Sequence, residues 1–235
     1  MLQAELRDGL VGGYVHGSAM LGGWHPVASD VDVLAVIAEP IDAAAQARLG
    51  ARLAAAGTPP GSGLEMSVIT AATAAELGDC QFEVHVTTGD DQKVVPGADH
   101  GGDPDLVLHV EVCRRAGYPV YGPPPAEVFG PVPRERVLAA ITAELRWGAG
   151  NGSVAYAVLN ACRAERYVVE NVLSSKLAAG EWARARYPEE AVITEALTQQ
   201  ASGHHVRPAT PEAIQFVAQV ADRLESREPP SSSVS

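Results

Sequence analysis

The chain of 235 residues is long enough for one large domain or two modest ones, and with 46% hydrophobic residues it can form a buried core. It carries 29 acidic and 17 basic residues, a net charge of −12, which argues against a nucleic-acid partner because that binding depends on cation contacts to phosphate. No apolar run approaches the roughly 20 residues of a membrane span, no secretory signal is recognisable, and the 3 cysteines are too scattered for a disulfide framework or metal ligation. We expect a cytoplasmic monomer without a membrane or nucleic-acid partner, whose acidic surface favours a cationic small molecule.

The first informative stretch is residues 14–36, YVHGSAMLGGWHPVASDVDVLAV, which predicts a strand, a Gly-Ser turn, a Gly/Pro-rich excursion and a second strand. At Gly17 and Ser18 the small residues let the backbone approach a ligand, and exposed amides can hold an anion. Asp30 and Asp32 lie two apart in a strand, so both carboxylates face the same side. Neighbouring carboxylates repel one another, which predicts a cation such as Mg²⁺ together with substrate phosphates. Each element alone is compatible with an ordinary turn and strand; together they favour a nucleoside-triphosphate site.

A helix is predicted over 41–57 and a strand over 64–70, which completes a strand–helix–strand unit. Glu65 then begins the strand next to the aspartate pair. A third carboxylate at that position can bind metal or accept the proton of an attacking hydroxyl. The alternative is a solvated glutamate at a strand edge.

The middle of the chain predicts a strand over 81–86, a polar loop over 89–104 and a helix over 106–116. His85 is either a half-buried strand residue or a contact to substrate. The proline-rich stretch from 122 to 133 is the clearest change in composition, and we place a domain boundary there because such segments end secondary structure.

Helical patterns dominate after Arg134 and predict an α-helical bundle. The expected helices cover 134–147, 153–175, 177–187, 189–202 and 210–226. The expected domains are 1–131 and 132–227, followed by a disordered tail over 228–235, which is rich in proline and serine.

The pattern Gly-Ser, eleven residues, then Asp-x-Asp resembles the signature of the nucleotidyltransferase superfamily. More narrowly, HGSAMLGGWHPVASDVDVLAVI is similar to the aminoglycoside 3''/9-adenylyltransferases, which inactivate streptomycin and spectinomycin. The run LEMSVI at 64–69, the segment FGPVP at 129–133 and the spacing from Cys162-Arg163 to Ser175-Lys176 extend the resemblance over most of the chain. It implies an N-terminal nucleotidyltransferase α/β domain with a mixed sheet, a C-terminal helical bundle, and an active site between them.

The resemblance also implies roles for individual residues and a Mg²⁺-dependent transfer of AMP from ATP to a hydroxyl of an aminoglycoside or aminocyclitol, with release of pyrophosphate. Taken alone, an arginine or lysine here would be read as a helix-surface cation, and Trp147 as a core or interface residue. The implied metal ligands are Asp30, Asp32 and Glu65, with Glu65 also the general base; the implied nucleotide contacts are Gly17, Ser18, Ser29, Arg163 and Lys176; the implied substrate contacts are Trp147 and His85.

Two departures from the family pattern bear on the acceptor. The loop expected at 148–153, GAGNGS, lacks the acids that hold streptomycin amines in the family, and His85 stands where a family tryptophan recognises streptomycin. The resemblance therefore favours spectinomycin over streptomycin. Two alternatives stay open: a nucleotidyltransferase that acts on another small molecule or on protein hydroxyls, and a non-catalytic antitoxin or binding module with this fold.

Overall fold

The computed structural model describes residues 9–57, 59–89 and 92–226. The chain forms two compact units, Met1–Ala140 and Ile141–Ser235. The division falls within a helix that begins at Arg134. The domain limits expected at 131/132 and 227 stay predictions, and the tail expected over 228–235 lies outside the described residues.

The described part of the first unit is built on one mixed six-stranded sheet with the order β5-β4-β3-β2-β1-β6. Strands β2 and β3 pair in parallel and the other neighbours pair antiparallel, which confirms the expected mixed sheet. The parallel pair requires a crossover, and a helix between the two strands supplies it. The strands are β1 (Leu10–Val15), β2 (Val31–Ile37), β3 (Leu64–Thr70), β4 (Val84–Thr87), β5 (Lys93–Pro96) and β6 (Tyr118–Tyr121).

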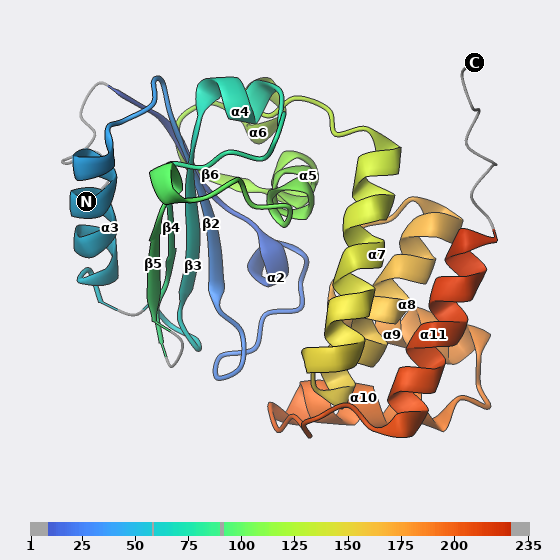
Figure 1. Ribbon diagram of the computed structural model, residues 1–235. Helices are drawn as coiled ribbons and strands as arrows, with labels where there is room; N and C mark the ends of the chain where they lie inside the picture. The colour runs from blue at the N-terminus through green and yellow to red at the C-terminus, as the bar shows by residue number, and fades with distance from the viewer. Residues whose placement is uncertain (1–8, 58, 90–91, 227–235) are drawn as a thin grey trace, which may run out of the picture. The chain divides into compact units, whose positions relative to one another are not determined.

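Helices cover both faces of this sheet (Figure 1). On one face Ala35 and Ile37 of β2 pack with Leu49 and Leu53 of the crossover helix α3, whose first turn is capped by Asp42. Asp32 lies three residues before Ala35. Because strand side chains alternate, its side chain points to the opposite face of the sheet, where α5 lies. The helices of this unit are α2 (Gly17–Met20), α3 (Ala43–Ala54), α4 (Ala71–Ala75), α5 (Leu106–Ala116) and α6 (Pro125–Val128), with a 3-10 turn η2 (Gly97–Asp99).

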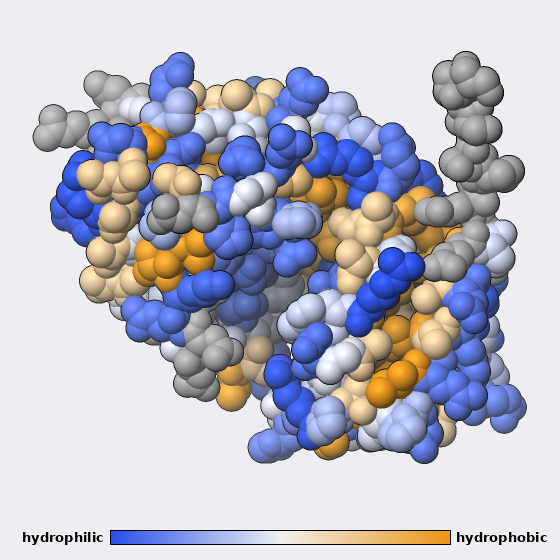
Figure 2. All heavy atoms as spheres, in the orientation of Figure 1, coloured by the Kyte–Doolittle hydropathy of each residue, from blue (hydrophilic) through white to orange (hydrophobic). Residues whose placement is uncertain are grey.

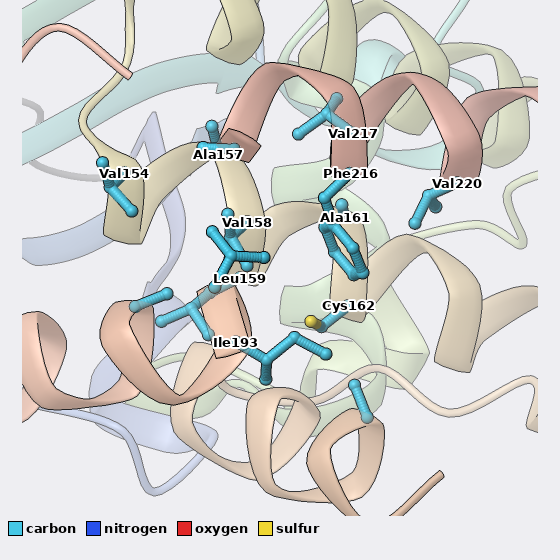
Figure 3. Packing of buried hydrophobic residues seen from close by; sticks show 14 of the residues in the cluster. Val154, Ala157, Val158, Leu159, Ala161, Cys162, Ile193, Phe216, Val217 and Val220 are labelled. Atoms are coloured by element: carbon cyan, nitrogen blue, oxygen red, sulfur yellow. The ribbon is translucent and has the colours of Figure 1, made fainter. Parts of the chain in front are cut away.

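The second unit is helical throughout its regular structure, as the sequence predicts. Serine and threonine caps start three of its helices, with Ser153, Ser175 and Thr210 each accepting a hydrogen bond from an amide of the first turn. The buried core is centred on α8, and Figure 3 shows Phe216 of α11 and Ile193 of α10 packed around it. The helices are α7 (Arg134–Asn151), α8 (Val154–Glu170), α9 (Lys176–Arg186), α10 (Ala191–Ser202) and α11 (Pro211–Glu225).

Three local expectations are corrected. The stretch expected as a loop at 148–153 is helical as far as Asn151. Its glycines have a packing role, because a β-carbon at Gly148 would lie 3.2 Å from the ring of Tyr156. Small residues here let α7 and α8 approach each other. The polar loop expected over 89–104 contains β5, which pairs with β4. The helix expected to reach 175 ends at Glu170, because Asn171 adopts a left-handed conformation with φ of 56°.

In Figure 2 hydrophilic residues cover much of the visible face, and hydrophobic areas lie among them. None of the helices in the described part of the chain has both the length and the apolar character needed to cross a membrane.

Candidate active site

Three carboxylates converge at one end of the parallel strand pair. In the β2–β3 register Asp32 lies directly opposite Glu65, as the sequence predicts for adjacent strands, and Asp30 lies just before β2. Ligand oxygens of Asp30, Asp32 and Glu65 all lie within 4.8 Å of one another. The backbone geometry of two neighbouring strands therefore gathers the three predicted metal ligands in one place.

The electrostatics of this cluster indicate that a cation belongs to it. Burial of Asp32, followed by the charge of Asp30 and then that of Glu65, raises the pKa of its carboxyl from 3.8 to about 7, although His109 lowers it. A hydrogen bond from the Ser18 backbone N–H lowers that pKa but does not cancel the effect. An oxygen-only set of this kind matches the preference of Mg²⁺ for hard ligands. The residues present thus fit the magnesium ion that the sequence predicts.

The backbone at Gly17 lies directly against this cluster. Its φ is +62°, which a side chain rarely tolerates, and a β-carbon at this position would lie 1.7 Å from the Oδ2 atom of Asp32. The predicted Gly-Ser turn is in fact the start of the one-turn helix α2, and the amide of His16 just before it donates to the Asp32 carbonyl at 3.0 Å. Only glycine fits between the turn and the carboxylate.

Ser18 presents a hydroxyl that the described protein leaves unused. Its Oγ atom is buried and has no hydrogen-bond partner within the described residues. Because a buried hydroxyl without a partner is costly, the position favours a bound acceptor such as a phosphate oxygen. The same observation holds for the Nε2 atom of His16, whose side chain is 2% exposed.

His109 is a site residue that the sequence reasoning missed. It lies on α5, with its Nε2 atom 3.8 Å from the Oε1 atom of Glu65, and its ring meets that of His16 edge-on. Burial works against a charged imidazole here, but the carboxylates of Glu65 and Asp32 outweigh it and raise the pKa of His109. Burial and His109 together hold the pKa of His16 well below its usual value, so His16 is neutral. The available signal was a histidine among apolar residues in the predicted helix 106–116.

Two further predicted residues of the first unit already have protein partners. The hydroxyl of Ser29 accepts a hydrogen bond from the His25 amide at 3.0 Å, which organises the excursion before β2. The Nδ1 atom of His85 lies 3.0 Å from the Ser67 hydroxyl, and burial lowers the pKa of this histidine. Roles for Ser29 in nucleotide binding and for His85 in substrate binding stay predictions.

The remaining predicted residues belong to the second unit. The Nε atom of Arg163 donates to the Ser174 carbonyl at 3.0 Å, and Lys176 is the first residue of α9, with its ammonium 4.5 Å from the centre of the Tyr156 ring. Trp147 on α7 is 53% exposed and meets Tyr156 edge-on. An exposed tryptophan contradicts a core role, and it leaves an aromatic surface for a ligand.

The helical half of the chain matches a known family. Residues 127–225 fit the family model described as "Aminoglycoside adenylyltransferase, C-terminal domain". The match covers most of the helical unit and is to the C-terminal domain of aminoglycoside adenylyltransferases. The resemblance predicted from the sequence is thereby confirmed.

A solved structure has the same fold as this chain. The chain is similar to the crystal structure of a spectinomycin adenyltransferase, AAD(9), from Enterococcus faecialis with ATP and spectinomycin, with a TM-score of 0.73 and 18% identity over 95% of each chain. This likeness confirms the predicted fold class. A second structure, a toxin–antitoxin with AMP-PNP, has a TM-score of only 0.30 and 15% identity over 63% of this chain and 86% of the other, which is too low to support an argument.

Proposed function

We propose that this protein transfers AMP from ATP to a hydroxyl of an aminoglycoside or aminocyclitol and releases pyrophosphate. The observation that carries the proposal is the convergence of Asp30, Asp32 and Glu65 beside Gly17 and the unpartnered Ser18 hydroxyl. Such a site combines a place for a divalent cation with donors for phosphate, which is what nucleotidyl transfer requires. The adenylyltransferase family of the C-terminal domain and the fold of the spectinomycin adenyltransferase support the same activity.

Each carboxylate has a role in this proposal. Asp30, Asp32 and Glu65 hold Mg²⁺, which when bound neutralises charge on the triphosphate and on the leaving pyrophosphate. Glu65 also accepts the proton of the acceptor hydroxyl as its oxygen attacks the α-phosphorus and the bond to pyrophosphate breaks. A charged His109, 3.8 Å from Glu65, offsets part of the negative charge before substrates bind.

Cations and backbone groups bind the phosphates of ATP. The Ser18 hydroxyl and the Gly17 backbone contact the terminal phosphates, with Ser29 nearby, and Arg163 and Lys176 supply positive charge. The location of Lys176 supports this role, since a lysine in the first turn of a helix is disfavoured by the helix dipole, whereas an anion is favoured there. Arg163 adds a guanidinium that can grip two phosphate oxygens.

The acceptor in this proposal is a cationic antibiotic, with spectinomycin preferred to streptomycin. Trp147 supplies an exposed aromatic surface for it and His85 a second contact. The preference rests on the segment 148–153, which contains no acidic residue to hold the amines of streptomycin, and on His85 in place of the family tryptophan. The net charge of −12 assists the approach of a cationic acceptor.

The test is an assay of purified protein with Mg·ATP and a panel of aminoglycosides and aminocyclitols, read by mass spectrometry for an AMP adduct. Asp32→Asn is expected to lower the rate at least about 100-fold, because it removes a charge from the metal site. Asp79→Asn, an exposed aspartate of the same unit, is the matched control and should keep the wild-type rate.

The outcomes separate the proposal from its alternatives. An adduct on spectinomycin alone supports it in full, and an adduct on streptomycin contradicts the preference. Binding of Mg·ATP without any adduct indicates another small molecule or a protein hydroxyl as acceptor. No ATP binding indicates a non-catalytic antitoxin or binding module.

A further inference from the structure

Glu144 lies at the centre of a side-chain network in the second unit. Its Oε1 atom accepts a short hydrogen bond from the Tyr156 hydroxyl and a second one from the Nδ2 atom of Asn160 at 3.3 Å. Glu144 is on α7, and both donors are on α8. No other partner of Glu144 appears among the described residues, so its charge is directed at these two groups.

The first arm of the network leads to Arg163. Asn160 is 5% exposed, and its Oδ1 atom accepts a hydrogen bond from the Nη1 atom of Arg163 at 3.2 Å. An ionised carboxylate can only accept hydrogen bonds, so Glu144 forces the amide nitrogen of Asn160 to face it and the amide oxygen to face the guanidinium. The Ser174 carbonyl accepts from Nε of Arg163 and the Asn160 oxygen accepts from Nη1, so two sides of the guanidinium are held.

The second arm leads to Lys176. The ammonium of Lys176 lies 4.5 Å from the centre of the Tyr156 ring. A phenol that donates its proton toward a carboxylate has a more electron-rich ring, and such a ring attracts a cation more strongly. Glu144 therefore acts on Lys176 through Tyr156, as it acts on Arg163 through Asn160.

We infer that Glu144 is a positioning residue that orients Arg163 and Lys176 together for the phosphates of ATP. The inference rests on the proposed function, in which these two cations bind the triphosphate. Glu144 itself does not contact the nucleotide. Its carboxylate, on α7, accepts hydrogen bonds from both Tyr156 and Asn160, the residues that contact Lys176 and Arg163. The two cations therefore keep their spacing before ATP binds. Preorganisation of this kind raises affinity because less side-chain entropy is lost on binding.

The test compares the binding of Mg·ATP and adenosine by isothermal titration calorimetry. Glu144→Gln keeps the size of the side chain but removes its charge and the constraint on the Asn160 amide, and we expect the Kd for Mg·ATP to rise about tenfold, as for loss of a charged hydrogen bond. Binding of adenosine, which has no phosphate, should change less than about twofold. Glu135→Gln, an exposed glutamate of the same helix, is the matched control and should change neither.

Two more variants separate the arms. Asn160→Ala interrupts the Arg163 arm and should weaken Mg·ATP about fivefold, whereas Tyr156→Phe removes only the hydroxyl, keeps the ring, and should cost about twofold to threefold. Glu144→Gln combined with Tyr156→Phe should be no weaker than Glu144→Gln alone, because both changes break the same arm. Thermal unfolding without ligand measures any effect on stability separately, and Tyr156→Phe keeps the inference testable if Glu144→Gln does not fold.

Three results would overturn the inference. Unchanged Mg·ATP affinity in folded Glu144→Gln would show that the network does not orient the cations. Equal losses for ATP and adenosine would indicate a structural role alone. Unchanged ATP affinity with a raised KM for the acceptor would place Glu144 in the acceptor site instead. If the wild-type protein binds no ATP, the proposed function fails as well, which distinguishes that failure from the other three.

Discussion

Unit 1 gathers its candidate carboxylates at one end of strands β2 and β3, and unit 2 holds its candidate cations on helices α8 and α9. In unit 1 the backbone does most of the positioning, because the parallel register sets Glu65 opposite Asp32 and Asp30 immediately precedes β2. In unit 2 the positioning comes from other side chains, because Arg163 and Lys176 are reached through hydrogen bonds and a ring contact.

This difference has an electrostatic counterpart. The carboxylates of unit 1 lie close together, and burial, with the neighbouring charge of Asp30, raises the pKa of Asp32. The cations of unit 2 are embedded in a network that ends in the carboxylate of Glu144. A bound cation stabilises buried carboxylates that lie close together, whereas a network with internal partners needs only to keep its geometry. We therefore expect substitutions in unit 1 to affect activity most, and substitutions in unit 2 to affect affinity and stability.

The largest effect is expected for Gly17→Ala. A β-carbon 1.7 Å from Asp32 Oδ2, on a residue with φ of +62°, must displace either the turn or the carboxylate. AMP transfer should fall at least about 100-fold, since both the metal ligand and the phosphate contact move. Gly22→Ala is the control, because Gly22 has a similar φ of +73° and open space around it. Similar rates for the two variants would contradict a backbone-determined site.

A smaller effect, on stability, is expected for Arg223→Met in unit 2. Arg223 donates two hydrogen bonds to Glu165, which is 1% exposed and also accepts from the Tyr187 hydroxyl. Removal of the arginine leaves a buried charge without its partner and should lower the free energy of unfolding by about 3 kcal/mol in urea titrations.

The comparison for this variant is Arg184→Met, which breaks an exposed pair with Glu181 and should cost at most about 0.5 kcal/mol. At a temperature where both proteins are folded, Mg·ATP binding should be retained. Equal losses of stability for the two variants would mean that the Glu165 network does not hold the bundle.

Much of the fold and part of the site follow from local sequence rules. The bounds of β3 and of α5 are those predicted, because alternation and an apolar helical face are evident there. The pairing of Asp32 with Glu65 follows from the adjacency of two predicted strands, and Asp30 lies close to Asp32 in the sequence. Where hydrophobic residues recur with the period of a strand or a helix, the sequence predicts the secondary structure well.

The parts that escaped prediction depend on contacts distant in sequence. His109 matters because α5 packs beside Glu65, and Glu144 matters because α7 packs beside Tyr156; neither residue lies in a motif. The helical segment at 148–151 is predicted as a loop because it contains glycines. Their role is seen only in the structure, where Gly148 leaves room for Tyr156 of α8. Side-chain networks of this kind leave no periodic pattern in the sequence, so the roles of residues in unit 2 were harder to predict than those in unit 1.

The last prediction concerns pH and sharpens the electrostatic contrast. The pKa of Asp32 is raised from 3.8 to about 7, so below that pH a proton competes with the metal, and the Kd for Mg²⁺ should rise up to about tenfold per pH unit as the pH falls below 7. Between pH 4 and 7 the folded protein binds a proton at Asp32 that the unfolded chain has lost, so this group alone lowers stability as the pH rises through that range. Mg²⁺ should reverse the loss near pH 7 by replacing the proton. Thermal unfolding from pH 5 to 8 with and without Mg²⁺ measures both effects, and Asp32→Asn should abolish the difference. A magnesium effect independent of pH would mean that Asp32 is ionised throughout, and that the cluster in unit 1 is as well compensated as the network in unit 2.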